Sequence, residues 1–233
     1  MKDMTLPGLT GKRIAITAGA GGIGLCIARA LRAQGARLAI CDVDEGALDA
    51  AKEELGAEVA LIADVSDEEQ VATFLARTEG VLGGLDALVN NAGIAGPTGG
   101  VDEISTEEWR RCIDICLTGQ FLCTRLAVPM LRAAGGGSIV NISSAAGRFG
   151  YAYRTPYAAA KWGVIGFTQS LAKELGPSDI RVNAILPGII AGPRIEKVIA
   201  ARAEQTGVSH EEMTAEYLSR VSLRRMTPPE DVA

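Results

Sequence analysis

The chain has little histidine, few aromatic residues and no long apolar run. Among 233 residues there is one histidine, His210, and only 4% are phenylalanine, tyrosine or tryptophan. A single histidine without clustered ligands around it does not suit a zinc or iron site, so we expect no bound metal. No apolar run approaches the roughly 20 residues that cross a bilayer, and Met1–Thr5 leads into no apolar signal region. We therefore expect a cytoplasmic protein without a membrane partner.

The sequence also lacks an excess of positive charge. It holds 23 lysines and arginines against 28 aspartates and glutamates, a net charge of −5. Nucleic-acid-binding proteins usually present a basic face, so we expect no nucleic-acid partner. The five cysteines include no CxxC pair, which argues against a disulfide framework. Cys112 and Cys116 lie one helical turn apart, but without further ligands nearby their packing in a core is favoured over metal binding.

What the sequence does contain is an alternation of apolar, β-prone runs with helical patterns. Runs such as Ile14–Ile16 and Leu38–Ile40 are apolar throughout, which is typical of parallel strands buried on both faces. The expected strands are Arg13–Thr17, Arg37–Cys41, Glu58–Ile62, Ala87–Asn90, Ser138–Ile142 and Arg181–Leu186. The expected helices are Ile23–Gln34, Glu45–Leu55, Asp67–Leu82, Ser105–Ala133 and Pro156–Gly176. This order predicts a single α/β domain over residues 1–233, a Rossmann-like doubly wound parallel sheet with helices on both faces.

A glycine-rich turn, Thr17-Ala18-Gly19-Ala20-Gly21-Gly22-Ile23-Gly24, joins the first strand to the first helix. Such a turn lets the backbone approach a pyrophosphate, and the free N–H groups of the helix start bind the anion. Asp42 ends the next strand, where a carboxylate accepts hydrogen bonds from ribose hydroxyls and repels a 2′-phosphate. The pattern therefore favours NAD over NADP. The alternatives are a tight turn without a ligand and an Asp42 that merely caps a loop.

Together with further motifs, this turn resembles the short-chain dehydrogenase/reductase family. The other matching segments, in the family's order between Leu9 and Val232, are Asp64-Val65, Asn90-Asn91-Ala92-Gly93, Ser143-Ser144, Tyr157-Ala158-Ala159-Ala160-Lys161, Arg181-Val182-Asn183 and Pro187-Gly188. The resemblance implies an NAD-dependent oxidoreductase that interconverts a secondary alcohol and a ketone by hydride transfer. It implies a cofactor site made of Gly19, Gly22, Ile23, Gly24, Asp42, Asp64, Val65, Asn91, Ala92, Gly93, Tyr157, Lys161, Pro187, Gly188 and Ile190.

The resemblance also assigns the catalytic residues Ser144, Tyr157 and Lys161. Ser144 is expected to hold the substrate oxygen, Tyr157 to transfer the proton, and Lys161 to bind the nicotinamide ribose. Tyr157 and Lys161 are four residues apart and so share one face of a helix. A nearby ammonium group favours the ionised phenol, which suits an acid and base in alcohol oxidation and ketone reduction.

Two positions depart from the family pattern. Ala18 replaces the first glycine of the turn, which we expect to be tolerated through a negative φ at this residue. Cys116 replaces the usual asparagine of a proton relay with the lysine. A thiol is a poorer donor than an amide, so this change affects the proton relay more than the hydride transfer.

Substrate and assembly are less defined by the sequence. We expect a lid at about residues 188–222, in which Arg194 lies, and Arg154 precedes Tyr157. Both arginines are candidates for binding an anionic substrate group, with solvated surface arginines as the alternative reading. Family members are usually tetramers or dimers that pair through their two long helices, which implies a homo-oligomer. Relatives also normally end with one more helix and a last strand, for which residues 1–233 hold no counterpart.

Two other functions remain open. A 3-oxoacyl thioester reductase is indicated by similarity to many such chains, but it would favour NADPH and a basic docking patch. Asp42 and the net negative charge argue against it. A catalytically silent NAD-binding regulator or scaffold is favoured only by Cys116, whereas the intact set of Ser144, Tyr157 and Lys161 argues against it.

Overall fold

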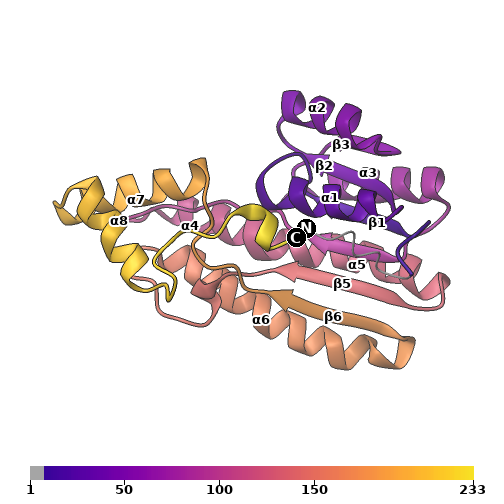
Figure 1. Cartoon of the computed structure of the whole chain (residues 1–233). Coiled ribbons are helices and arrows are strands. Elements are labelled where there is room, and N and C mark those ends of the chain that lie inside the picture. Colours follow the sequence, from indigo (N-terminus) through magenta and orange to yellow (C-terminus); the bar gives the residue numbers. More distant parts are fainter. Residues whose placement is uncertain (1–7) are drawn as a thin grey trace.

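Six parallel strands form one sheet in the order β3-β2-β1-β4-β5-β6 in the computed structural model, which describes residues 8–233. The strands are β1 (Arg13–Thr17), β2 (Arg37–Asp42), β3 (Val59–Ile62), β4 (Ala87–Asn90), β5 (Gly137–Ile142) and β6 (Ile180–Ile185). Their carboxyl ends all point toward one side of the molecule (Figure 1). Met1–Thr5, on which the absence of a signal region depended, lies outside the described residues.

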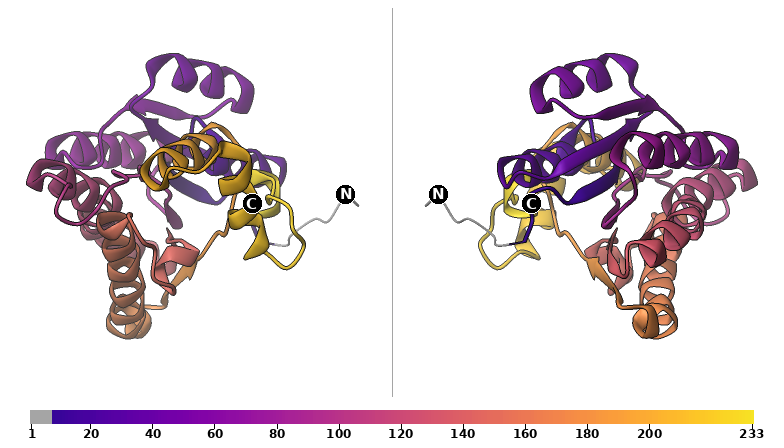
Figure 2. Two further views of the ribbon diagram at one scale, coloured as in Figure 1. Left: turned by 90° about the vertical axis from the view of Figure 1, so that its left-hand side faces the viewer. Right: turned by 90° about the vertical axis from the view of Figure 1, so that its right-hand side faces the viewer.

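Helices cover both faces of this sheet, as Figure 2 shows in two end-on views. α1 (Gly22–Ala33) and α2 (Glu45–Leu55) pack on one face, and α3 (Glu68–Leu82), α5 (Gly119–Ala133) and α6 (Thr155–Leu175) pack on the other. The strand residues alternate between two cores: Ile14 and Ile16 face α1, whereas Ala15 faces α3 and α5. The predicted doubly wound α/β fold is confirmed.

The long helix predicted over Ser105–Ala133 is interrupted. α4 (Thr106–Ile113) starts with the capping box of Ser105 and Glu108, but a π-helical turn at Asp114–Thr118 separates it from α5. A π-turn carries an extra residue and is often found at functional sites. Periodicity alone does not reveal it because the apolar stripe continues on both sides.

The same stretch, Thr106–Ala133, is the one helical segment within residues 8–233 with the length and mean hydropathy of a membrane-spanning helix. The stretch contains no continuous apolar run, because charged and polar residues interrupt it. In its most apolar window, 56% of the residues are buried inside the protein. Burial of this kind is typical of a core helix and makes the stretch weak evidence for a membrane span.

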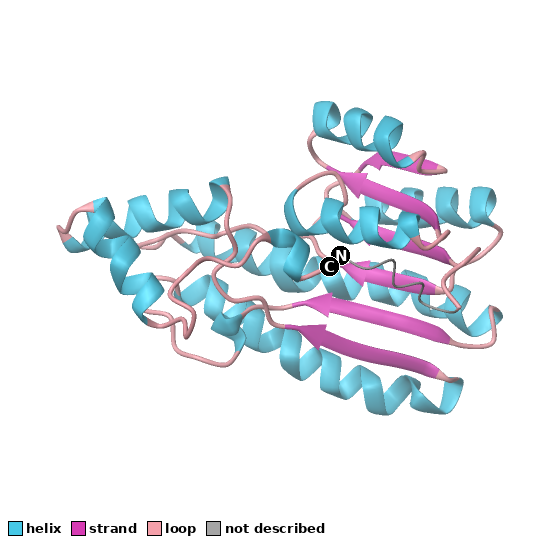
Figure 3. Ribbon diagram, viewed as in Figure 1, coloured by secondary structure: helices cyan, strands magenta, loops and turns pink. Residues whose placement is uncertain are grey.

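A pair of helices lies beyond the carboxyl ends of the strands, in the segment where a lid was expected (Figure 3). It consists of α7 (Pro193–Thr206) and α8 (His210–Ser219), packed around Ile199, Met213 and Tyr217. After α8 the chain returns, and Thr227 exchanges backbone hydrogen bonds with Ile189 and Ala191. Short 3₁₀ turns complete the chain at Ala145–Gly147, Gly176–Ser178 and Pro229–Asp231.

The amino ends of the strands are held by an ion pair between Arg13 and Asp86. The Arg13 guanidinium donates from Nε and Nη2 to the Asp86 carboxylate, at 2.8 and 3.1 Å, and from Nη1 to the carbonyl of Gly83. Asp86 also accepts from the Arg13 backbone N–H at 2.9 Å. These hydrogen bonds lower the pKa of Asp86 to about 2. All three guanidinium nitrogens of Arg13 are therefore in use.

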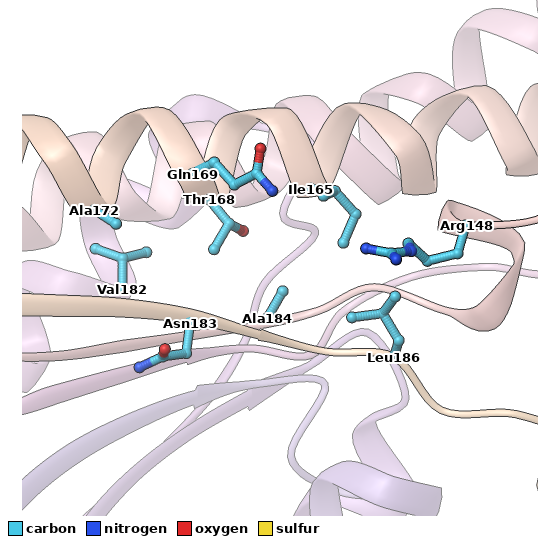
Figure 4. A pocket seen from close by; sticks show the side chains of 9 residues that line it. All are labelled: Arg148, Ile165, Thr168, Gln169, Ala172, Val182, Asn183, Ala184 and Leu186. Carbon is cyan, nitrogen blue, oxygen red and sulfur yellow. The ribbon is translucent and has the colours of Figure 1, made fainter.

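At one edge of the sheet, β6 pairs only with β5 among the strands of the described chain. A shallow groove of about 280 Å³ runs beside it between α6 and β6. Figure 4 shows Ile165, Thr168 and Gln169 of α6 above Val182, Ala184 and Leu186, with Asn183 on the other side of the strand. None of the predicted catalytic residues lines this groove, so it is separate from the site at the strand ends.

Candidate active site

The glycine turn leaves β1 with strained backbone. Ala18 has φ +49°, so the expected negative φ at this position is wrong. An L-residue in the left-handed region costs roughly 1–2 kcal/mol, and the surrounding contacts hold the turn in place. The Asn91 side-chain amide donates to the carbonyls of Thr17 and Ala18, at 3.1 and 2.9 Å.

Gly24, in the first turn of α1, allows the helix to approach this bend closely. A Cβ at Gly24 would lie 2.1 Å from the carbonyl oxygen of Ala18 and 2.5 Å from the amide nitrogen of Asn91. No side chain larger than hydrogen fits there without a shift of the backbone. The turn therefore presents backbone N–H groups at the start of α1, as anion binding requires.

Asp42 lies at the carboxyl end of β2, beside this turn. One carboxylate oxygen accepts from the Ala20 backbone N–H at 3.2 Å, and the other accepts from Val43 at 2.8 Å. The N-cap of α2 is a different residue, Asp44, which accepts from Ala47. The carboxylate of Asp42 thus faces the turn and does not serve as the helix cap.

The segment after β4 contributes backbone groups to the same side. Asn90 is buried, and its amide donates to Thr124 and Asn141, at 3.0 and 2.9 Å, linking β4 with α5 and β5. Ala92 donates through its backbone N–H to the hydroxyl of Thr17.

Asp64 and Val65 follow β3, and the Asp64 carboxylate accepts a hydrogen bond from the Ser66 hydroxyl at 2.7 Å. Among these, Asn90 is a bracing residue, whereas Asp64, Val65 and Asn91–Gly93 line the strand ends.

The two serines after β5 have different surroundings. The Ser143 hydroxyl is buried and donates to the backbone carbonyl of Lys161 at 2.8 Å, so it braces α6 against the end of β5. The Ser144 hydroxyl is partly exposed and accepts from the Ala146 N–H at 3.2 Å, leaving its own proton available. Pro187, after β6, accepts from the Ala145 N–H. Ile190, the last expected cofactor contact, forms a β-bridge with Thr227 at the base of the lid.

Tyr157 and Lys161 lie on α6, which faces the end of β5. Lys161 is 3% exposed, and its ammonium group donates to the Ile142 carbonyl at 2.8 Å. The same nitrogen lies 5.7 Å from the centroid of the Tyr157 ring. The ammonium group and the phenol ring are therefore held next to each other at the end of β5.

Cys116 lies on the π-turn next to this lysine. Its thiol accepts from the Ile94 N–H at 3.4 Å and donates to the Ile94 carbonyl at 3.5 Å. Both Cys112 and Cys116 are buried. A hydrogen bond from Cys112, and next to it the charge of Lys161, lower the pKa of Cys116 although burial opposes this, and the same pairing raises the pKa of Cys112. The thiol therefore has the hydrogen bonds of a structural anchor.

The two candidate arginines differ. Arg194 is exposed and donates to the Gly93 carbonyl. The exposed reading is wrong for Arg154, which is 2% exposed and lies between the rings of Tyr151 and Tyr157. Arg202 of α7 is also buried and packs against the ring of Tyr153. The sequence did not indicate its burial, because the same pattern is typical of a surface residue on an amphipathic helix.

The comparisons with known proteins agree with this geometry. The family model described as short chain dehydrogenase matches residues 12–203. The trans-4-hydroxycyclohexanecarboxylate dehydrogenase of Sinomonas cyclohexanicum is 45% identical over 78% of this chain and 74% of its own length, and the cis-4-hydroxycyclohexanecarboxylate dehydrogenase of that organism is 39% identical over 95% and 86%. The structure of NAD⁺-bound xylitol dehydrogenase superposes with a TM-score of 0.92 at 28% identity, over 97% of this chain and 90% of that one. The chain is an oxidoreductase of the short-chain dehydrogenase/reductase family.

Proposed function

We propose that this protein is an NAD-dependent dehydrogenase that converts a secondary alcohol to its ketone, with Tyr157 as the acid and base. The observation that carries the proposal is the buried ammonium of Lys161, fixed on the Ile142 carbonyl and 5.7 Å from the ring of Tyr157. The relatives named above are dehydrogenases of secondary alcohols, which supports the same reaction class.

The glycine turn fits a dinucleotide, because glycine at position 24 lets α1 begin directly against the turn, where a Cβ would lie 2.1 Å from the Ala18 carbonyl oxygen. The pyrophosphate is assigned to the turn at Gly19 and to the N–H groups of Gly22, Ile23 and Gly24, since the Gly19 N–H itself donates to the Cys41 carbonyl at 3.0 Å. The adenosine is assigned to Asp42, Asp64 and Val65. The nicotinamide half is assigned to Asn91, Ala92, Gly93, Tyr157, Lys161, Pro187, Gly188 and Ile190. When bound, the cofactor supplies the hydride acceptor.

The protein's part in the reaction is the movement and placement of a proton. Ser144 donates a hydrogen bond to the substrate oxygen and stabilises the charge that develops there. Tyr157 takes the hydroxyl proton during oxidation and returns it during reduction. Lys161 holds its ammonium group beside the Tyr157 ring, and Cys116 holds the Ile94 backbone next to it.

The expected assembly is a homo-oligomer in the cytoplasm. Three aromatic side chains on the predicted pairing helices, Trp109, Phe121 and Trp162, are 40%, 44% and 51% exposed in the single chain. Burial of these rings against a second copy would remove apolar area from water. The five cysteines are free and buried, which suits a reducing compartment.

Replacement of Tyr157 by phenylalanine tests the reaction. We expect kcat for NADH formation from secondary alcohols to fall by about 1000-fold, while NADH still binds in fluorescence titrations. Tyr153→Phe removes the same hydroxyl from an exposed ring and is expected to leave kcat nearly unchanged. Undiminished turnover in Tyr157→Phe contradicts the assignment, and NAD binding without turnover of any alcohol favours the silent regulator.

Replacement of Asp42 tests the choice of cofactor. We expect the native enzyme to prefer NAD over NADP by roughly 100-fold or more, because the carboxylate repels a 2′-phosphate. Asp42→Asn should reduce this ratio of kcat/KM values by at least about 10-fold. Asp44→Asn removes a neighbouring charge but keeps the helix cap, and should leave the ratio unchanged. A native preference for NADPH would instead favour the 3-oxoacyl thioester reductase.

A further inference from the structure

Arg154 is a buried cation whose hydrogen bonds are mostly unmade. It directly precedes α6 and is 2% exposed. Its Nη2 donates to the Ala95 carbonyl, but Nε and Nη1 are buried and have no hydrogen-bond partner within residues 8–233. Those two nitrogens carry three of the five N–H bonds of a guanidinium group. Most of the donor capacity of this side chain is therefore unused.

The charge of Arg154 is also unbalanced. No carboxylate in the described part of the chain forms an ion pair with it, nor with Arg194, Arg202 or Lys161. A buried charge is strongly disfavoured unless it is paired. The rings of Tyr151 and Tyr157, whose centroids lie 5.1 and 5.0 Å from the guanidinium carbon, compensate only part of this. The described residues therefore supply no carboxylate that balances the charge of Arg154.

The position of the guanidinium places a balancing anion next to the reacting group. Arg154 packs against the face of Tyr157, the proposed acid and base. It donates a hydrogen bond to the carbonyl of Ala95, two residues after Asn91–Gly93. The preceding residue, Tyr153, has φ +62°, a conformation that a bulky side chain adopts only when its surroundings enforce it. Strain of this kind at a functional site indicates that the chain holds Arg154 in a required place.

We propose that Arg154 binds a carboxylate of the substrate, so that the alcohol oxidised here is a hydroxy acid and the product a keto acid. This inference rests on the proposed function, since it assigns the second group of the molecule whose hydroxyl meets Tyr157. The carboxylate receives the hydrogen bonds of Nε and Nη1 and balances the buried charge. Neutral alcohols and polyols leave the Nε and Nη1 donors without a partner and the charge unbalanced, so they are poor substrates.

Matched acid and amide substrates test the proposal. Wild-type enzyme should oxidise 4-hydroxycyclohexanecarboxylate and 3-hydroxybutyrate with kcat/KM at least about 10-fold above their primary amides, because charge-assisted hydrogen bonds are the stronger ones. Arg154→Gln should lower kcat/KM for the acids by about 100-fold and for the amides only slightly. Arg154→Lys, which keeps the charge, should lie between the two. Arg148→Gln, which removes an exposed arginine beside the β6 groove, is the control and should change neither.

A binding measurement separates this inference from the reaction itself. Cyclohexanecarboxylate should raise the melting temperature of the wild-type protein with NADH present, and cyclohexanecarboxamide should not. Arg154→Gln should lose the rise, whereas Tyr157→Phe should keep it. Equal rates for acid and amide, or an equal loss of both in Arg154→Gln, would overturn the carboxylate site. Absence of turnover with the carboxylate effect intact would overturn only the proposed dehydrogenase.

Discussion

Arg13 and Arg154 lie at opposite ends of the same sheet, and the fold satisfies their hydrogen-bond donors to different extents. At the amino ends of the strands, Arg13 uses Nε, Nη1 and Nη2 within the fold. At the carboxyl ends, Arg154 uses only Nη2. A side chain whose donors are all satisfied contributes to stability, whereas a buried donor without a partner is expected where a ligand completes the structure. The contrast separates the amino ends of the strands, where the charge is satisfied within the fold, from the carboxyl ends, where we propose that small molecules bind.

Among changes at the two ends of the strands, the largest effect is expected from Gly24→Ala at the carboxyl end, on the affinity for NADH. The added Cβ meets the Ala18 carbonyl and the Asn91 amide at 2.1 and 2.5 Å, so the turn must move. We expect the Kd for NADH to rise by about 100-fold, a loss typical of an overpacked site, in fluorescence titration. Gly21→Ala, whose Cβ would meet nothing within 4 Å, is the control. Equal affinities of the two variants would show that the turn does not cradle the cofactor.

A smaller effect, on stability alone, is expected at the amino edge from Asp86→Asn. The folded-state pKa of Asp86, about 2, lies below its ordinary value of 3.8. The pair therefore contributes stability that is complete above pH 3.8 and is lost as the pH falls through 2. We expect the free energy of unfolding in urea to drop by about 1–2 kcal/mol at neutral pH, after allowance for solvent screening.

That difference should narrow as the pH falls below 3.8, and NADH affinity at neutral pH should be unchanged. Asp49→Asn, at an exposed position of α2, is the control and should have little effect at any pH. A loss of stability in Asp86→Asn that is the same at all pH values would contradict the assigned ion pair.

The smallest effect is expected from Ala18→Gly. Glycine adopts φ +49° without strain, so this change should raise the free energy of unfolding by up to about 1 kcal/mol. Ala20→Gly, in the same turn but without a positive φ, should lower it instead. If both glycines lower stability, the strain at Ala18 is not significant. The difference between the two variants gives the free energy of unfolding that the positive φ of Ala18 costs the protein.

The doubly wound sheet and the alternation of strands and helices along the chain could be predicted, because the apolar runs reflect burial on both faces of the strands. The position of Asp42 at the end of β2 followed from the same pattern, whereas Tyr157 and Lys161, which lie on α6, were indicated by the family resemblance. The φ of Ala18 and the π-turn around Cys116 could not be predicted. Both depend on contacts between distant segments, Asn91 with β1 and Cys116 with Ile94. The burial of Arg154 was missed for the same reason, since Ala95 and Tyr151 enclose it only after folding.

Within residues 8–233, the outer edge of β6 pairs with no further strand. An unpaired strand edge is a template on which another chain can add a strand, and such edges promote aggregation unless polar side chains guard them. Along β6, Arg181 and Asn183 are exposed and provide that protection, but Ile185 at the strand end is 37% exposed and does not. Ile185 is therefore the apolar side chain of β6 against which an added strand would pack.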